Sequence, residues 1–228
     1  MPSAYPRSPK LVKGALVVYE SHAPGPPQKV IAFQYNPEQL SRTLEKREPE
    51  KKRGGAGGDK EDVYRVQGPP KETFKLTVQL NAADQLAEPD DHPTVREHGL
   101  LPVLAALEML LYPTNAQVMQ NEALAQGGKV QISPADLPLT LLVWGRSRVL
   151  PVLLTSFSVT EELFDPALNP IQVKVELGLQ ALTYMELKAT SQGRDIYMAY
   201  QKQKEQLAAM HQPDEEERRT VTSFIPSR

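Results

Sequence analysis

The sequence contains no cysteine among its 228 residues. Disulfide bonds, thiolate metal centres and cysteine nucleophiles are therefore excluded. The lack of cysteine also fits a protein that folds in a reducing cytosol.

An excess of charge of one sign is missing as well. Lys and Arg total 26, Asp and Glu total 28, and the formal net charge is −2. Proteins that bind nucleic acid usually present a basic surface. The near-balance therefore predicts no nucleic-acid partner.

Long apolar runs are also absent from the sequence. Residues 1–6 contain no apolar core of a signal peptide, and the most apolar window, 100–111, is interrupted by Pro102 and Glu108. A membrane-spanning helix needs about 20 consecutive apolar residues. We therefore expect no membrane insertion and no export by the usual route.

Proline and glycine are plentiful, with 21 and 13 residues. They separate short elements and favour an all-β or α+β domain. The chain is long enough for one domain with a sizeable core, with or without an appendage. We expect a mainly β, α+β fold in which residues 11–183 form the domain.

The clearest pattern lies near the C-terminal end, where residues 164–170 are followed by a strict alternation. A period of two predicts a strand with one buried face. At roughly 3.3 Å per residue the strand is about 35 Å long. The apolar segment 150–159 precedes it, so the two predict a long β-hairpin suited to a large barrel or sandwich. The alternating apolar residues are Ile171, Val173, Val175, Leu177, Leu179 and Ala181.

Further strands are predicted along the chain. Segments 11–20 and 29–35 form a hairpin, 74–80 alternates clearly, and 139–144 is a buried strand that turns at 145–148 into the long hairpin. A helix with one apolar face is predicted to follow Pro102, and Pro113 ends that helix. Segment 115–138 is ambiguous. The apolar residues of the predicted helix are Val103, Leu104, Leu107, Leu110 and Leu111.

Three segments lie outside this framework. Residues 1–10 are expected to be a flexible arm, and the mixed-charge, glycine-containing segment 45–62 a mobile loop. Residues 184–228 are expected to form a C-terminal helix over 193–211 and a charged tail that stays disordered until something binds it. The helix has a thin apolar side that we predict to contact a neighbouring subunit, formed by Ile196, Tyr200, Leu207 and Met210.

The chain offers little chemistry. The glycine-rich segment 54–58 lacks the Gly-Lys-Ser/Thr ending of a phosphate loop. The consecutive residues Asp90, Asp91 and His92 have no second cluster to complete a metal shell. No Gly-x-Ser-x-Gly elbow supports a hydrolase triad. We therefore expect no catalytic, cofactor-binding or metal site, and no enzyme.

Four segments, taken in order, resemble a known family. They are 33–40, the strand 72–80 after Gly68-Pro69-Pro70, 139–145 with its Trp-Gly pair, and the hairpin with Phe-Asp-Pro and Asn-Pro. At this spacing they resemble the tube-like domain of baseplate proteins of contractile injection systems, the phage-tail-like particles with which bacteria puncture target cells. The resemblance covers roughly residues 10–183.

This resemblance implies a tail-tube fold, a β-barrel or sandwich with a flanking helix. It also implies a homo-hexameric ring in the baseplate hub between tube and spike. The partners it implies are the inner tube protein, the spike protein and the baseplate wedge proteins. The implied location is the bacterial cytoplasm during assembly, in a particle that lysis releases.

The chain departs from the family pattern in three places. Many relatives carry a LysM module after this domain, whereas residues 184–228 are too short and too polar for one. Residues 167–169 stand where relatives more often show an Asp-Gly type turn, and Gln172 replaces a commonly basic residue. The C-terminal helix and tail are expected to take over the tether to the wedges.

Three functions remain open from the sequence. The first is a structural hub or tube-initiating ring subunit that joins tube to spike and baseplate. The second is an adaptor or cargo-loading binding module of the same particle, with the fold kept as a scaffold. The third is a small hydrolase on a β-barrel, for which the sequence gives no positive sign.

Overall fold

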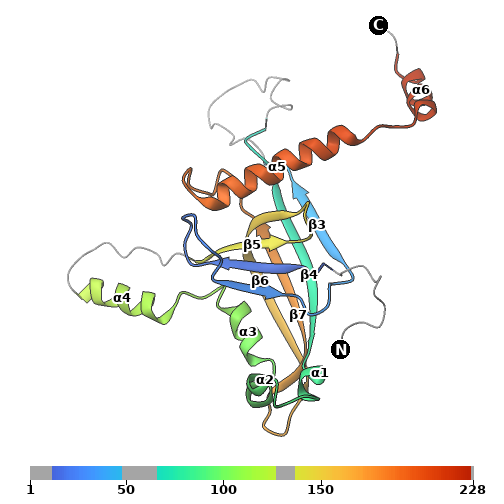
Figure 1. Cartoon of the computed structure of the whole chain (residues 1–228). Coiled ribbons are helices and arrows are strands. Elements are labelled where there is room, and N and C mark those ends of the chain that lie inside the picture. The colour runs from blue at the N-terminus through green and yellow to red at the C-terminus, as the bar shows by residue number, and fades with distance from the viewer. Residues whose placement is uncertain (1–11, 48–65, 127–136, 227–228) are drawn as a thin grey trace, which may run out of the picture.

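The computed structural model describes residues 12–47, 66–126 and 137–226. The expected arm 1–10 and most of the expected loop 45–62 lie outside these residues. Seven strands and six helices occur in the described part, and Figure 1 shows their arrangement. The strands are β1 Ala15–Tyr19, β2 Lys29–Ala32, β3 Leu40–Glu45, β4 Lys71–Asn81, β5 Leu139–Val143, β6 Val149–Phe164 and β7 Pro170–Ala181. The helices are α1 Ala83–Leu86, α2 Pro93–His98, α3 Leu101–Glu108, α4 Asn115–Gln126, α5 Gln192–Met210 and α6 Glu215–Ser223.

The fold is mixed α+β and mainly β, as the sequence predicts. All seven strands of the described residues belong to one antiparallel sheet with the order β2-β1-β5-β6-β7-β4-β3. The sheet is open, so the closed form of the expected barrel is not present. Among the described residues, the edge strands β2 and β3 do not pair with each other, and one edge of each has no strand partner.

Strand β6 holds the two halves of the sheet together. Its first residues pair with β5 and the rest pair with β7 through to Phe164. The pairing with β7 shifts between Leu154 and Ser156, so Thr155 is the extra residue of a β-bulge. Its hydroxyl donates to the carbonyl oxygen of Gly178, 3.1 Å away. The bulge bends β6, and Figure 1 shows β1 and β2 crossing the direction of β4 and β7.

Along β4 and β7, every second side chain points into the hydrophobic core. Phe74 and Val173 are fully buried there, and the buried face continues onto β1, β5 and β6. Apolar burial of this kind contributes about 25 cal/mol per Å². The largest fully buried side chains are Phe33, Phe74, Leu16, Leu139, Leu142, Leu150, Leu177, Leu179, Val78, Val152, Val173 and Val175.

The side chain of Gln34 links the part of the sheet that contains β1 and β2 to the part that contains β4. The amide of Gln34, just after β2, donates to the carbonyl oxygen of Asn81 at 2.8 Å and accepts from the Asn81 backbone N–H at 2.7 Å. The Gln34 amide thus satisfies the backbone N–H and C=O groups of Asn81, as a residue of a neighbouring strand would. This bond pair ties the segment after β2 to the end of β4.

Helices α1, α2 and α3 cover one end of the sheet, beside the turn between β6 and β7 (Figure 1). The helix predicted at 103–111 is shorter than expected and ends at Glu108. Leu110 and Leu111 bond to carbonyls three residues earlier, which tightens the chain well before Pro113. Helix α2 was not predicted from the sequence, and Pro93 lies in its first turn.

The predicted C-terminal helix is present as α5, Gln192–Met210, and part of the charged tail is also helical. Residues Glu215–Ser223 form α6, in which Asp214 accepts a hydrogen bond from the Glu216 backbone N–H at 3.2 Å. Three acidic residues in the first turn favour this helix because they face its positive dipole end. Strand β3 and helix α4 were not predicted either.

Candidate assembly surface

Helix α5 is fastened to the sheet by its first half. Ser191 caps it by accepting from the Gly193 backbone N–H at 3.2 Å. The rings of Tyr197 and Tyr200 are buried beneath it, 6.5 Å apart at their centroids and edge to face. Burial raises the pKa of Tyr197 to about 12, so this phenol stays neutral. The helix therefore crosses the sheet at a fixed place (Figure 1).

A buried carboxylate makes this attachment specific. Glu72 of β4 is 3% exposed. Its carboxylate accepts hydrogen bonds from the Tyr200 hydroxyl at 3.0 Å, from Lys204 Nζ at 2.8 Å and from Arg42 Nε of β3. Lys204 Nζ also lies 4.1 Å from the centroid of the Tyr200 ring. We call these four residues, Glu72, Arg42, Tyr200 and Lys204, the Glu72 cluster.

Protonation in the Glu72 cluster follows from these contacts. Burial on its own raises the pKa of Glu72, but hydrogen bonds from Lys204, Arg42 and Tyr200 outweigh it, and the pKa lies below its ordinary value. Burial lowers the pKa of Lys204, and the bond with Glu72 opposes that effect. Burial and the carboxylate both raise the pKa of Tyr200. The cluster is thus a carboxylate held by one neutral and two cationic donors.

The four predicted contact residues on α5 do not share one environment. Tyr200 is 4% exposed and belongs to the protein's own core. Ile196 is half-buried. Leu207 and Met210 are exposed, at 49% and 73%, where α5 extends past the sheet. The structure thus leaves Leu207 and Met210 accessible to a partner, while Tyr200 holds the helix in place.

The outer side of the sheet is polar. Cross-strand rows run over β4, β7 and β6, and one of them is Thr77, Glu176 and Ser158. A groove of about 700 Å³ lies over this side. Its lining is mostly uncharged and comprises Glu38, Gln39, Ser41, Lys75, Leu76, Thr77, Gln79, Ser156, Phe157, Ser158, Glu176, Leu177 and Gly178. We call this side the polar face.

Both sheet edges carry exposed apolar side chains. Val30 of β2 is 59% exposed and Leu44 of β3 is 48% exposed. An unpaired edge with exposed apolar residues is a template for pairing with another chain. The described strands therefore present two separate edges to which a neighbour can bind.

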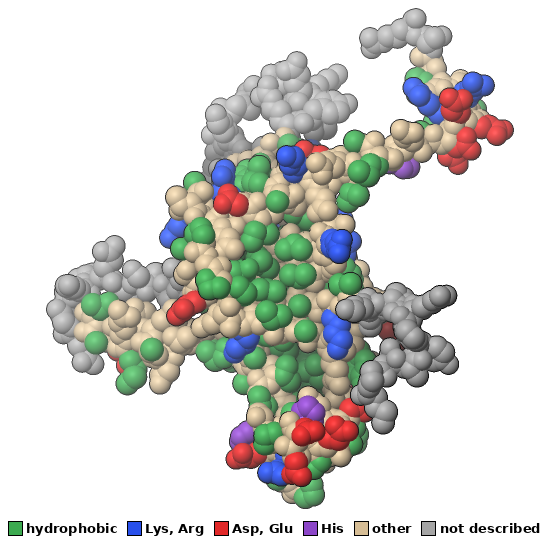
Figure 2. Space-filling model, in the orientation of Figure 1, with side chains coloured by type: hydrophobic (Ala, Val, Ile, Leu, Met, Phe, Trp, Pro, Cys, Tyr) green, Lys and Arg blue, Asp and Glu red, His purple; other side chains and the backbone are tan. Residues whose placement is uncertain are grey.

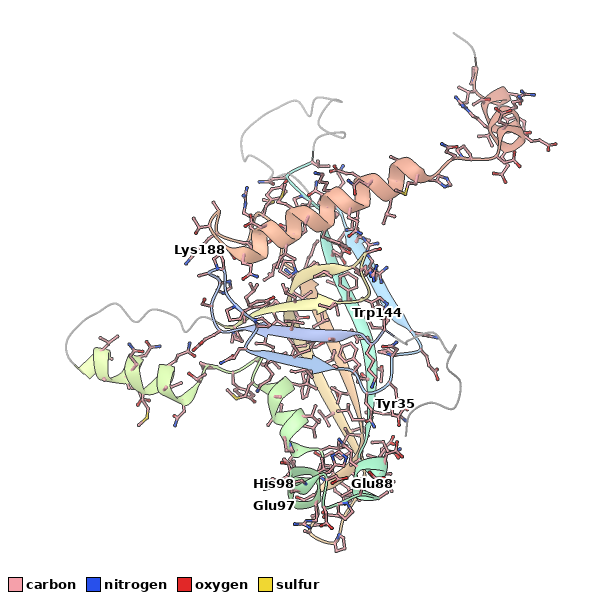
Figure 3. All side chains as sticks on the ribbon, in the orientation of Figure 1. Tyr35, Glu88, Glu97, His98, Trp144 and Lys188 are labelled. Carbon is pink, nitrogen blue, oxygen red and sulfur yellow. The ribbon has the colours of Figure 1, made fainter. Side chains whose placement is uncertain are left out.

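The two ends of the sheet differ in charge. In the segment 82–99, around α1 and α2, Arg96 is the single Lys or Arg beside Asp84, Glu88, Asp90, Asp91 and Glu97. Figure 2 shows these acidic side chains gathered at that end, and Figure 3 places Glu88, Glu97 and His98 there with Lys188 at the opposite end. The molecule therefore has an acidic end, which we define as segment 82–99, and a mixed-charge end near α5.

The residues considered for chemistry do not come together. Asp90 is exposed and pairs with Arg96 at 3.2 Å, while the glycine-rich segment 54–58 lies outside the described residues. Within 12–47, 66–126 and 137–226, no group of three or more His, Asp or Glu side chains is placed to hold a metal ion. Among the same residues, no helix combines the length and apolar character needed to cross a membrane.

No protein-family model and no curated protein matches this sequence. The surface itself is defined by two free sheet edges, a polar face, an acidic end and an anchored C-terminal helix. The Glu72 cluster was not predicted from the sequence. The alternation of the strand could have revealed it, because Glu72 lies two residues before Phe74 and four before Leu76. It therefore belongs to the buried face of β4.

Proposed function

We propose that this chain is a structural subunit of a ring in a bacterial contractile injection system. The ring would be the baseplate hub or tube-initiating layer that joins the inner tube to the spike and baseplate. The observation that carries the proposal is the open antiparallel sheet formed by the described residues, in which β2 and β3 each have one edge without a strand partner. Neighbouring subunits that pair through these edges satisfy the exposed backbone groups and close a ring.

The polar face supports the same proposal. A ring closed through β2 and β3 has one side of its sheet toward a lumen. The polar face suits that position, because Thr77, Ser158 and Glu176 stay hydrated while Phe74, Leu76 and Val78 face the core. Its mostly uncharged lining allows material to pass without strong attachment.

The difference between the two ends gives the ring a direction. Every subunit of a cyclic ring presents the same end on the same side. The acidic end then forms one rim and the α5 end forms the other. Two different rims fit a layer that joins two different neighbours, the tube on one side and the spike on the other.

Imaging of native particles tests the proposal. The chain is tagged in its host, purified with whatever accompanies it, and examined by electron microscopy. Six-fold density joined to a tube, sheath or spike supports the ring. A chain that purifies alone, with intact particles elsewhere in the lysate that lack it, contradicts the proposal and favours the adaptor function.

The edge of β3 gives a more specific prediction. Leu44→Lys is expected to reduce incorporation into particles at least tenfold, because a charge on the edge disfavours pairing with another strand. The fold should persist, since surface substitutions usually change stability by less than about 0.5 kcal/mol. The measurement is the amount of chain in purified particles together with the melting temperature.

Leu44→Met is the matched control, because it keeps an apolar side chain of similar size at the same position. It should enter particles as the unmodified chain does. Equal incorporation of the Lys and Met variants would show that the β3 edge faces solvent in the particle.

A further inference from the structure

The turn between β6 and β7 presents apolar side chains that the fold hardly uses. Leu168 is 77% exposed, and Phe164, at the end of β6, is 47% exposed. Both belong to the turn that Figure 1 shows projecting past α1 and α2 at the acidic end. Because apolar side chains stabilise a fold in proportion to the area they bury, these two contribute little to the stability of their own chain.

Leu168 also holds a backbone conformation that disfavours leucine. Among the described residues it is the one non-glycine residue with a positive φ, +67°. In this left-handed region a Cβ crowds the following carbonyl oxygen, so glycine or asparagine is the usual occupant. A leucine here lowers the stability of the turn, and its exposed side chain does little to offset that loss. Such an outlier points to a role outside the fold.

Hydrogen bonds fix the shape of the turn. The Asp165 carboxylate accepts from the backbone N–H groups of Ala167 and Asn169, each at 2.8 Å, and from the Asn169 side-chain amide, also at 2.8 Å. That amide donates at 3.0 Å to the carbonyl oxygen of Glu97, which ties the turn to α2. A turn that is already ordered loses little conformational entropy on binding, which favours its use as an anchor.

Acidic side chains lie beside this turn. Segment 82–99 has five acidic residues and one Arg. Of these acidic residues, Asp84, Glu88 and Asp91 are exposed and take part in no ion pair among the described residues. Figure 2 shows hydrophobic side chains at the tip of this end with acidic ones beside them. An apolar centre with a polar rim is the usual anatomy of a protein-binding site.

The charge of the acidic end selects the kind of partner. A second copy that met this end across a two-fold axis would bring two acidic ends together, and like-charge repulsion disfavours that contact. In a cyclic ring every copy presents this end on the same side, so neighbours within the ring do not cover it. The surface that fits is an apolar socket with Lys or Arg around its rim, on a different protein.

We propose that the β6–β7 turn is a docking anchor, in which Leu168 inserts into an apolar socket with a basic rim on a protein other than this chain. Phe164 adds to the apolar contact, and Asp84, Glu88 and Asp91 face the basic rim. The inference deepens the proposed ring and rests on it for the place of that protein, the layer beside the acidic rim. Leucine at position 168 then serves binding at the expense of stability.

Photo-crosslinking from the turn tests the contact directly. The full-length chain carries p-benzoylphenylalanine in place of the exposed Ala167, which leaves Leu168 intact, and is expressed and irradiated in its native host. Mass spectrometry of the joined peptide should identify one protein, linked through a segment that combines apolar residues with Lys or Arg. The control carries the same photoreactive group in place of Met198, which is 42% exposed on α5, and should not join that segment. A crosslink to a second copy of this chain, to many unrelated proteins, or to none overturns the inference.

Leu168→Gly in the same crosslinking chain separates binding from folding. It relieves the backbone strain, so the melting temperature should rise by about 2–4 °C. It also removes the apolar side chain, so the crosslinking yield should fall about tenfold. Leu168→Met keeps an apolar side chain of similar size and should match the natural residue in both measurements. A lower melting temperature in Leu168→Gly would show that the leucine serves the fold and would overturn the inference.

A charge change tests the rim. Asp91→Lys should lower the crosslinking yield about threefold, since a lysine then faces the basic rim of the partner. Glu20→Lys makes the same change at an exposed residue outside the acidic end and should leave the yield unchanged. Equal yields from the two variants would overturn the proposed chemistry of the partner.

The outcomes separate this inference from the ring itself. Particles that contain the chain but yield no crosslink from the turn overturn the inference and leave the ring standing, as does a Leu168→Gly chain that is crosslinked as well as the natural sequence. A partner segment of the expected chemistry, on a protein that belongs to no tube, spike or baseplate, supports the inference and removes the ring. A chain that is absent from particles and gives no crosslink overturns both.

Discussion

Replacing Glu72 with glutamine is expected to lower the free energy of unfolding by about 2 to 3 kcal/mol. Breaking a fully buried ion pair costs more, about 3 to 5 kcal/mol. Here the side chains of Arg42 and Lys204 remain 32% and 35% exposed, so water can solvate the stranded cations. For a chain of this size the melting temperature should fall by about 4–12 °C.

The loss should depend on pH in a defined direction. The pKa of Glu72 is lower in the folded protein than its ordinary value of 4.5. The ionised carboxylate therefore contributes stability above that ordinary value, and the contribution is lost as the pH falls through the folded pKa. The difference in melting temperature between the natural protein and Glu72→Gln should be full at pH 7 and shrink below pH 4.5.

Glu162→Gln is the control for this experiment. Glu162 also accepts from a lysine, Lys174 at 2.9 Å, but it lies on the exposed outer side of β6. Exposed ion pairs contribute little, so the melting temperature at pH 7 should not change measurably. If Glu72→Gln behaves like Glu162→Gln, the Glu72 cluster does not fasten α5 to the sheet.

The long hairpin shows what period-two patterns can predict. The strand at 171–181 is confirmed to within one residue, because both its faces follow the alternation without interruption. The predicted 150–159 strand continues to Phe164 in the structure. Residues 160–164 were missed because they begin with polar residues and the pairing with β7 is irregular around Glu162, which breaks the alternation that defines a strand.

The elements that were missed share a physical cause. Strand β3 has one half-buried residue, Leu40, and helix α4 exposes nearly its whole described surface, so neither has an apolar pattern to detect. The role of Tyr200 was out of reach for a different reason. Its apolar spacing on α5 suggested an outward contact, whereas its hydroxyl binds Glu72, 128 positions away in the chain. Local periodicity cannot specify such long-range pairing.

Gly99 is the residue at which a single methyl group should do the most damage. It connects α2 to α3 with φ +55° and ψ −131°, a conformation open essentially to glycine alone. A Cβ there would lie 2.5 Å from the carbonyl oxygen of Pro170 and 3.0 Å from Cβ of Asn169. The Leu100 backbone N–H donates to that same carbonyl oxygen at 2.9 Å, and the Asn169 amide donates to the Glu97 carbonyl at 3.0 Å.

Gly99→Ala should therefore destabilise the protein by about 3 to 4 kcal/mol, from backbone strain together with displacement of the β6–β7 turn. Gly145→Ala separates the two causes. Gly145 also has positive φ, +72°, but a Cβ there meets no atom within 4 Å. Backbone conformation alone should cost about 1 kcal/mol at that position.

Chemical denaturation of both variants measures the difference. The gap between them reports the close approach of the α2–α3 connection to the hairpin turn, which positions the acidic end relative to the sheet. If the two variants lose the same stability, the helices and the hairpin turn are not held together by this contact. The acidic end would then lack the fixed position that a rim facing a specific neighbour requires.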